Sequence, residues 1–321
     1  MFIHLPFLFY RLFRKAKKQT QFSNHFWNNF FTEEEKKTIS KRNWKRIHNY
    51  PFQIIVFFAD LYADLTGKPI NEHQRLILTL FSGGLCLYDD FFDLQLLAPQ
   101  DLKDVYFGKN INSQLPEIQI FQKIQKEFKK NYTFSTAFTE ELLNFYDAQL
   151  KSQAQLKNIL SFADLKQISF DKGGLALVLA WLLLFDKTSE QERKCVYELG
   201  AWYQILDDTL DMADDKTNQI QTLATDVKSI KDLENLLYEQ TKIMRDLFKK
   251  LPYSVVNIKK ILRYLQIIGT SGKVHLYKLK KIQKKDTLKH TLQQFSIEDL
   301  KWQQSDKKNF WIACKFWWKE E

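Results

Sequence analysis

Apolar and polar positions recur along most of the chain with the period of an amphipathic α-helix. No stretch combines every-second-residue alternation with hairpin turns, which would predict β-strands. Stop and start signals divide the helical pattern, for example Thr66-Gly67-Lys68-Pro69 and the capping-box sequence Ser189–Glu192. The sequence therefore predicts an all-α fold, with helices over Phe52–Thr66, Asn71–Leu97, Glu117–Lys130, Glu140–Leu156, Phe162–Phe185, Ser189–Asp215, Ile230–Lys249 and Val255–Tyr277.

The helix predicted over Asn71–Leu97 carries an aspartate cluster inside apolar, aromatic sequence. Asp89 and Asp93 are four residues apart and share one helix face, while Asp90 is turned about 100° away. Acids stacked in this way repel each other, and the repulsion grows when they are partly buried. The cluster therefore predicts that a cation binds at this helix.

A second cluster ends the helix predicted over Ser189–Asp215. Asp207, Asp211 and Asp215 form a column at four-residue spacing, with Asp208 beside it. Neither cluster contains a histidine, and oxygen ligands of this kind suit Mg²⁺, whose coordination is usually completed by water and phosphate oxygens. We expect on the order of two or three Mg²⁺ ions, with Mn²⁺ as a substitute.

Three elements resemble the trans-isoprenyl diphosphate synthases and the related class I terpene synthases. They are the first cluster Leu85–Asp93, the segment Gly200–Asp211 and the lysine element Lys172–Leu177. The segment Gly200–Asp211 is the most specific of the three, because its glycine, aromatic-Gln and Asp-Asp-x-x-Asp parts keep the spacing of the family. The resemblance implies one domain over residues 1–321, an isoprenoid-synthase-type helical bundle with two facing Asp-rich helices around a central cavity.

The resemblance also implies roles for individual residues. Metal-bound carboxylates and basic side chains would neutralise the diphosphate of an allylic substrate as it leaves, and aromatic walls would shelter the carbocation. The implied catalytic residues are Asp89, Asp93, Asp207 and Asp211, and the metal ligands are these four with Asp90, Asp208 and Asp215. Lys172 is expected to contact the diphosphate, with Arg75, Lys216, Arg263 and Lys273 as weaker candidates from position. The expected pocket residues are Phe81, Gly84, Leu85, Tyr88, Phe92, Trp181, Tyr203 and Gln204, with Phe91 and Trp202 as further aromatic walls.

The reaction that follows ionisation is predicted from what flanks the clusters. The third carboxylate of the column favours a class I terpene synthase, a cyclase. The alternative is chain elongation with isopentenyl diphosphate, for which no arginine pair follows Asp93. The segment Lys41–Arg46 offers four basic residues upstream, but without the family's glycines. A second alternative is a non-catalytic partner subunit of a prenyl synthase, although such subunits usually have damaged motifs.

The expected length of the substrate depends on the residues four and five positions before Asp89. In the resembling family these residues line the end of the pocket that holds the prenyl tail. Here they are Leu85 and Gly84, and neither is a bulky aromatic residue. The sequence therefore predicts room for a tail of about fifteen to twenty carbons or longer.

Composition and net charge bear on the fold, the location and the partners of the protein. Few turn formers, nine Gly and six Pro in 321 residues, favour long helices, and three dispersed cysteines predict a reducing, cytoplasmic location. The net charge of +10 comes from bases scattered among acids, so nucleic acid is not an expected partner. A homodimer is common in the resembling family.

The two ends of the chain are rich in aromatic residues. The basic, aromatic segment 1–20 is compatible with an interfacial amphipathic helix in peripheral contact with a membrane, or with a plain helix packed on the body. The aromatic C-terminal segment 300–321 raises the same question, with packing as the default.

Overall fold

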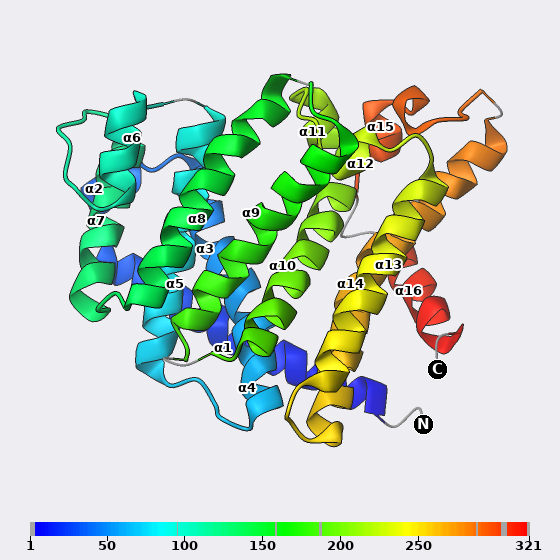
Figure 1. Ribbon diagram of the computed structural model, residues 1–321, viewed down its shortest axis with the longest axis horizontal. Helices are drawn as coiled ribbons and strands as arrows, with labels where there is room; N and C mark the ends of the chain where they lie inside the picture. Colours follow the sequence, from blue (N-terminus) through cyan, green and yellow to red (C-terminus); the bar gives the residue numbers. More distant parts are fainter. Residues whose placement is uncertain are drawn as a thin grey trace. The chain divides into compact units, whose positions relative to one another are not determined.

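The computed structural model describes residues 4–94, 96–157, 159–185, 188–286, 288–302 and 307–319. Helices make up the regular structure of these residues, and none of them forms a strand (Figure 1). The prediction of an all-α fold is thus confirmed. Within the same residues, no helix combines the length and apolar character needed to cross a bilayer.

The starts of the two helices that bear the aspartate clusters follow directly from the sequence. Helix α5 (Glu72–Asp93) begins after Asn71, whose side chain accepts a hydrogen bond from the Gln74 amide. Helix α10 (Glu190–Leu210) begins with the predicted capping box, in which Ser189 and Glu192 bond to each other's backbone N–H groups. These bonds satisfy amides that have no partner in the first helical turn.

The segment before α5 differs from the prediction of one continuous helix over Phe52–Thr66. Helix α3 (Lys41–Ile54) contains Pro51, and a π-helical stretch, Ile55–Ala59, follows it before α4 (Asp60–Thr66). A proline has no N–H to donate and crowds the preceding turn, so the regular α-helical bonding is interrupted nearby. Gly67, at a φ of 72°, ends α4 as predicted, because glycine adopts this left-handed conformation without strain.

The first of two compact units comprises Met1–Tyr146 and Leu179–Thr188. Helix α5 lies against α3 and against α7 (Pro116–Asn131), and Figure 1 shows these three helices side by side. The unit is filled by large aromatic side chains such as Trp27, Tyr62 and Phe91. Its other helices are α1 (His4–Phe30), α2 (Glu33–Thr38), α6 (Pro99–Tyr106) and most of α8 (Thr136–Ser152).

The second compact unit comprises Asp147–Val178 and Ser189–Glu321. Helix α10 packs on α13 (Ile230–Lys250) and α14 (Val255–Lys285), around the buried Trp202 and Tyr264. The unit also contains most of α9 (Phe162–Leu182), then α11 (Met212–Thr217), α12 (Leu223–Asp226), α15 (Ile297–Leu300) and α16 (Lys307–Lys319). The first aspartate cluster belongs to the first unit and the second cluster to the second, so one domain with two facing Asp-rich helices stays a prediction.

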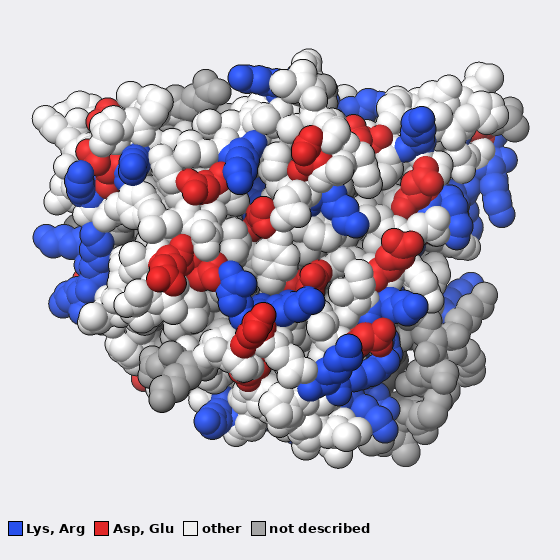
Figure 2. Space-filling view, in the orientation of Figure 1, with Lys and Arg blue, Asp and Glu red and all other residues white. Residues whose placement is uncertain are grey.

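The charged side chains are mixed in sign on the face that Figure 2 shows. Lys and Arg side chains lie interspersed with Asp and Glu over this face. This mixture of signs agrees with the scattered charges of the sequence. The aspartate clusters and the cavities near them are therefore the candidate functional sites.

Candidate functional site

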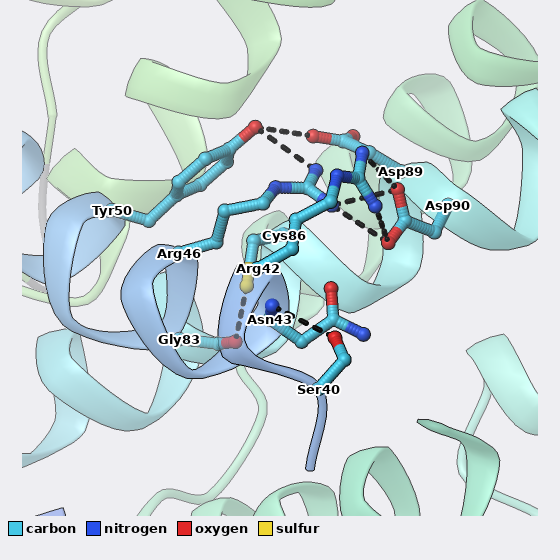
Figure 3. A network of polar contacts seen from close by, with 9 residues as sticks. All are labelled: Ser40, Arg42, Asn43, Arg46, Tyr50, Gly83, Cys86, Asp89 and Asp90. Carbon is cyan, nitrogen blue, oxygen red and sulfur yellow. Dashed lines mark hydrogen bonds and ion pairs between the residues drawn. The ribbon is translucent and has the colours of Figure 1, made fainter. Parts of the chain in front are cut away.

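The first aspartate cluster meets a row of side chains on α3 (Figure 3). Arg42 and Arg46 both bind Asp90: the Arg46 Nη1 atom lies 2.6 and 2.7 Å from the two carboxylate oxygens, and Arg42 forms a second, two-pronged pair at 3.0 and 3.2 Å. The Tyr50 hydroxyl donates a 3.1 Å hydrogen bond to Asp89 Oδ2. Residues 42, 46 and 50 are four apart, so they form one row along the helix face that packs on α5.

Asp90 is therefore a buried carboxylate that is already neutralised by protein groups. Its side chain is only 4% exposed, whereas the Arg42 side chain is 61% exposed. Burial lowers the pKa of Arg46, but the neighbouring Tyr50 and Asp90 outweigh it and hold the pKa above its ordinary value. The oxygens of Asp90 already accept bonds from two guanidinium groups, and Asp90 as a metal ligand stays a prediction. Asp89 remains the candidate ligand here; the Asp93 side chain lies outside the described residues.

An apolar cavity of about 540 Å³, counted to its open mouth, lies in the same unit. Helix α5 contributes Leu80, Phe81, Gly84, Leu85 and Tyr88, all within the nine residues before Asp89. Helices α7 and α8 and the segment between them supply further phenylalanines. Among the described residues that line the cavity, none carries a charged side chain. The complete lining is Leu80, Phe81, Gly84, Leu85, Tyr88, Tyr106, Phe121, Ile124, Gln125, Phe128, Phe134, Phe138, Leu142 and Phe145.

Four of the eight predicted pocket residues thus line this cavity, and the others lie elsewhere. Phe92 is buried against Tyr88 and Tyr146 outside the lining. Trp181 packs on Tyr62, and its indole N–H donates to Thr188. The remaining two, Tyr203 and Gln204, belong to α10 in the second unit, as does Trp202. Helical spacing identified the cavity residues of α5 but did not reveal which other helices complete the wall.

The second cluster lies where α10 ends and α11 begins. The sequence pattern predicts an unbroken helix through Asp215, but Asp211 leaves the helical conformation and caps both helices. The four-residue backbone bonds continue across this point, from the Asp211 amide to the Asp207 carbonyl and from the Asp215 amide to the Asp211 carbonyl, each 2.9 Å long. The column therefore survives the break. Asp207 and Asp211 are exposed and Asp215 is half-buried.

Asp208 is the buried member of this cluster. Its carboxylate accepts hydrogen bonds from Gln204 Nε2 at 2.8 Å and from the Leu223 amide at 3.2 Å. Both oxygens thus accept hydrogen bonds within the protein, and Asp208 as a metal ligand stays a prediction. Burial nonetheless raises the pKa of Asp208 to about 6.

The neighbouring carboxylates also have raised pKa values. Burial, followed by the charge of Asp214, raises the pKa of Asp211. Burial and the charges of Asp208, Asp211 and Asp207 raise the pKa of Asp215 to about 8. A bound cation would stabilise a negative charge that is this costly to maintain.

Close approach of α9 to α10 brings a lysine to the second cluster. A Cβ atom on Gly173 would collide with the backbone of Gly200, and the reverse also holds. Only glycine at both positions lets the two helices touch at this point. The positive charge of Lys172, next to this crossing, lowers the pKa of Asp208 against the larger effect of burial. The glycines of the two motifs thus have a geometric role.

The four weaker basic candidates have other surroundings. Arg75 is buried, where it pairs with Asp60 at 3.0 Å and bonds to Gln19. Lys216 donates to the carbonyls of Gln293 and Phe295. Both side chains thus bond to protein groups in this structure, and their contact with a diphosphate stays a prediction. Arg263 is exposed on α14, and Lys273 lines a separate small pocket beside Trp202.

The side chains of the second cluster are chemically suited to bind a hard divalent cation. They offer carboxylate oxygens, two of the side chains are exposed, and their charges repel one another. Among the residues that the structure describes, no three His, Cys, Asp or Glu side chains are grouped closely enough to hold a metal ion. A cation here would therefore take further oxygens from water or from a phosphate group, as Mg²⁺ commonly does.

This electrostatic arrangement predicts a pH dependence of stability. The folded-state pKa values of Asp208 and Asp215, about 6 and 8, lie above the ordinary value of 3.8. Between about pH 4 and pH 8 the folded chain binds more protons than the unfolded chain, so these groups make the free energy of unfolding fall as pH rises. In EDTA, Asp215→Asn is expected to raise the Tm at pH 8 by about 3–6 °C and at pH 5 by roughly a third as much.

Thermal unfolding followed by circular dichroism measures this difference. In the wild type, added Mg²⁺ should recover part of the same Tm increase at pH 8 and little at pH 5. The matched control is Asp246→Asn, which removes a half-exposed carboxylate, paired with Lys249, from α13 in the same unit. Equal Tm changes for Asp215→Asn at both pH values would contradict the raised pKa of Asp215.

Comparisons with known proteins do not extend this description. The chain matches no protein-family model, and no curated protein and no solved structure is significantly similar to it.

Proposed function

We propose that this protein is a Mg²⁺-dependent class I terpene synthase. It ionises a prenyl diphosphate of about fifteen to twenty carbons or more, cyclises or quenches the carbocation, and releases pyrophosphate. The observation that carries the proposal is on α5, where one helix supplies both an apolar cavity and the carboxylate of Asp89 that follows it. A substrate with an apolar tail and a charged head requires this combination.

The cavity suits the tail and the carbocation. Six phenylalanines and two tyrosines line it, and the faces of such rings attract a nearby cation. Because no charged side chain lines the cavity, the wall holds no carboxylate that could capture the cation. An apolar wall also excludes water, which would otherwise quench the cation early.

The carboxylates and Lys172 suit the diphosphate head. In the first unit, Asp89 would hold Mg²⁺. In the second unit, Asp207, Asp211 and Asp215 would do so, and a Mg²⁺ ion supplies positive charge to a leaving pyrophosphate. Lys172, held near Asp208 by the glycine crossing of α9 and α10, would add a fixed positive charge. Gln204 keeps Asp208 oriented by its hydrogen bond.

Chain elongation is the second candidate, and one observation favours it. Arg42 and Arg46 lie together beside the first cluster, and the Arg42 side chain is largely exposed. Two guanidinium groups at one place can bind a second diphosphate if they exchange the Asp90 carboxylate for it. The reaction would then join the allylic cation to isopentenyl diphosphate.

The deciding experiment is a product assay on the purified protein with Mg²⁺. Geranyl, farnesyl and geranylgeranyl diphosphates are each supplied with and without isopentenyl diphosphate, and hydrocarbons and diphosphates are both analysed. A hydrocarbon or alcohol from one substrate alone, lost in Asp89→Ala, supports the cyclase. Longer diphosphates that require isopentenyl diphosphate support elongation, and no product from any combination supports a non-catalytic partner subunit.

The wall of the cavity provides a prediction about substrate length. A Cβ atom on Gly84 would meet Phe121 at 3.5 Å, an ordinary contact, so Gly84→Ala should fold and keep its substrate preference. Gly84→Phe places a ring inside the cavity and is expected to shift preference toward the shorter substrate by about tenfold in kcat/KM. Kinetics with farnesyl and geranylgeranyl diphosphate measure the shift. If the ratio of the kcat/KM values for the two substrates is unchanged in Gly84→Phe, the prenyl tail does not occupy this cavity.

A further inference from the structure

The first three turns of α1 expose large aromatic side chains. Phe7 is 51% exposed, Tyr10 57% and Phe13 66%, which is unusual for aromatic residues so close together. The Arg11 guanidinium lies over the Phe7 ring, 4.5 Å from its centroid. Aromatic residues at these positions do not serve the core of the first unit.

The opposite side of the same helix is fixed to the first unit. Leu8 and Gln19 are buried, and Lys15 forms a 3.0 Å ion pair with Asp64. Further along, Trp27 is fully buried. Helix α1 is thus docked along one face, and its exposed aromatics belong to the face that points away from the body. The interpretation of segment 1–20 as a plain packed helix therefore accounts for the buried side of α1 but not for its exposed aromatic side.

Basic residues share the outward face with the aromatic residues. At about 100° per residue, Phe7, Tyr10 and Phe13 fall with Arg14, Lys17 and Lys18 inside an arc of about 140°. Arg14, Lys17 and Lys18 are exposed. No Asp or Glu occurs before Glu33, so no acid within the helix offsets this charge. The face therefore combines aromatic rings with an uncompensated positive charge.

We propose that this face of α1 binds an anionic lipid surface, with the helix lying in the plane of the membrane. The aromatic rings would enter the boundary between headgroups and acyl chains, where such rings are favoured, and the bases would lie among the lipid phosphates. A second copy of the chain is a poorer partner, because a symmetric contact through this face would oppose two rows of like charge. The face fits a negatively charged sheet of lipid.

The test is cosedimentation of the full-length protein with vesicles. One set contains phosphatidylcholine alone, and the other contains phosphatidylcholine with about 30% phosphatidylglycerol, a fraction that gives a negative surface potential. Two triple variants separate the two contributions. The first is Phe7→Ser with Tyr10→Ser and Phe13→Ser; the second is Arg14→Gln with Lys17→Gln and Lys18→Gln.

Matched controls remove similar groups from exposed positions of the second unit. The aromatic control is Tyr238→Ser with Val255→Ser and Val256→Ser, and the charge control is Lys228→Gln with Lys231→Gln and Lys259→Gln. All five proteins are checked for helical content by circular dichroism. Because the substituted side chains are exposed, folding should be preserved in each.

We expect the wild type and both controls to bind the anionic vesicles and to bind the neutral ones weakly. Each base near such a surface contributes about fivefold in affinity, so the charge variant should bind on the order of 100-fold more weakly. The aromatic variant should lose at least about tenfold. The proposal is overturned if both triple variants bind like the wild type, or if the aromatic variant instead converts a stable dimer to monomer. Vesicle binding is read without any substrate, so it is independent of the proposed reaction.

Discussion

Replacing Asp211 by Asn should reduce product formation from the preferred prenyl diphosphate by at least about 100-fold. The substitution keeps the shape of the side chain but removes one negative charge from the carboxylate column. Asp211 has solvent-accessible surface at the joint between α10 and α11, but desolvation by the surrounding protein atoms and the charge of Asp214 raise its pKa. A bound cation stabilises the charge of such a carboxylate most, so replacing Asp211 should weaken the binding of Mg²⁺.

The matched control for Asp211→Asn is Asp214→Asn. Asp214 is exposed in the same short segment but lies outside the column formed by Asp207, Asp211 and Asp215. Its substitution should leave product formation within about threefold of the wild type, because it removes charge without removing a ligand. The Mg²⁺ concentration that gives half-maximal rate should rise in Asp211→Asn alone. Equal losses in the two variants would mean that general negative charge, and not the column, supports the reaction.

Replacing Arg75 by Met should destabilise the fold by about 3–5 kcal/mol and lower the Tm by roughly 10 °C. The side chains of Arg75 and Asp60 are only 3% and 9% exposed, and a 3.0 Å ion pair joins them. Without the guanidinium, the Asp60 carboxylate stays buried near Lys15 but loses its direct partner. Urea unfolding at pH 7 measures the change in the free energy of unfolding.

The double variant Arg75→Met with Asp60→Leu is expected to recover most of this stability. Replacing both members of a buried ion pair by apolar groups is often nearly neutral, whereas removing one member leaves a buried charge. Arg263→Met, at an exposed position of α14, should change stability by less than about 0.5 kcal/mol. Similar urea midpoints for Arg75→Met and Arg263→Met would show that Arg75 does not hold the first unit together.

Much of the fold was predictable from local sequence. The cap at Ser189 and the stop at Gly67 depend on side chains and backbone conformations within a few residues, so the sequence places them correctly. The break at Asp211 and the π-helical stretch after Pro51 were not predicted. The periodicity of apolar residues continues through both points, because it records which side faces the core and not which backbone bonds form.

The candidate site was predictable only in part. Four-residue spacing correctly aligned Asp207, Asp211 and Asp215, because that column runs along one stretch of chain. The same rule could have found the row of Arg42, Arg46 and Tyr50 on α3. It could not have shown that this row meets Asp90, since that contact depends on how α3 packs against α5.

The sequence alone determined most of the helices, the caps at Asn71 and Ser189 and the two carboxylate clusters, all of which depend on interactions within a few turns. Tertiary structure decided which charges are satisfied. In the sequence, Arg75 and Asp90 cannot be told from charged residues that face solvent. Packing nevertheless buries both side chains and pairs each with a side chain of opposite charge. The aromatic residues of α1 are as apolar as those of the core, yet packing leaves them exposed. Burial depends on the neighbours that distant segments provide, and hydrophobic periodicity along one helix does not specify those neighbours.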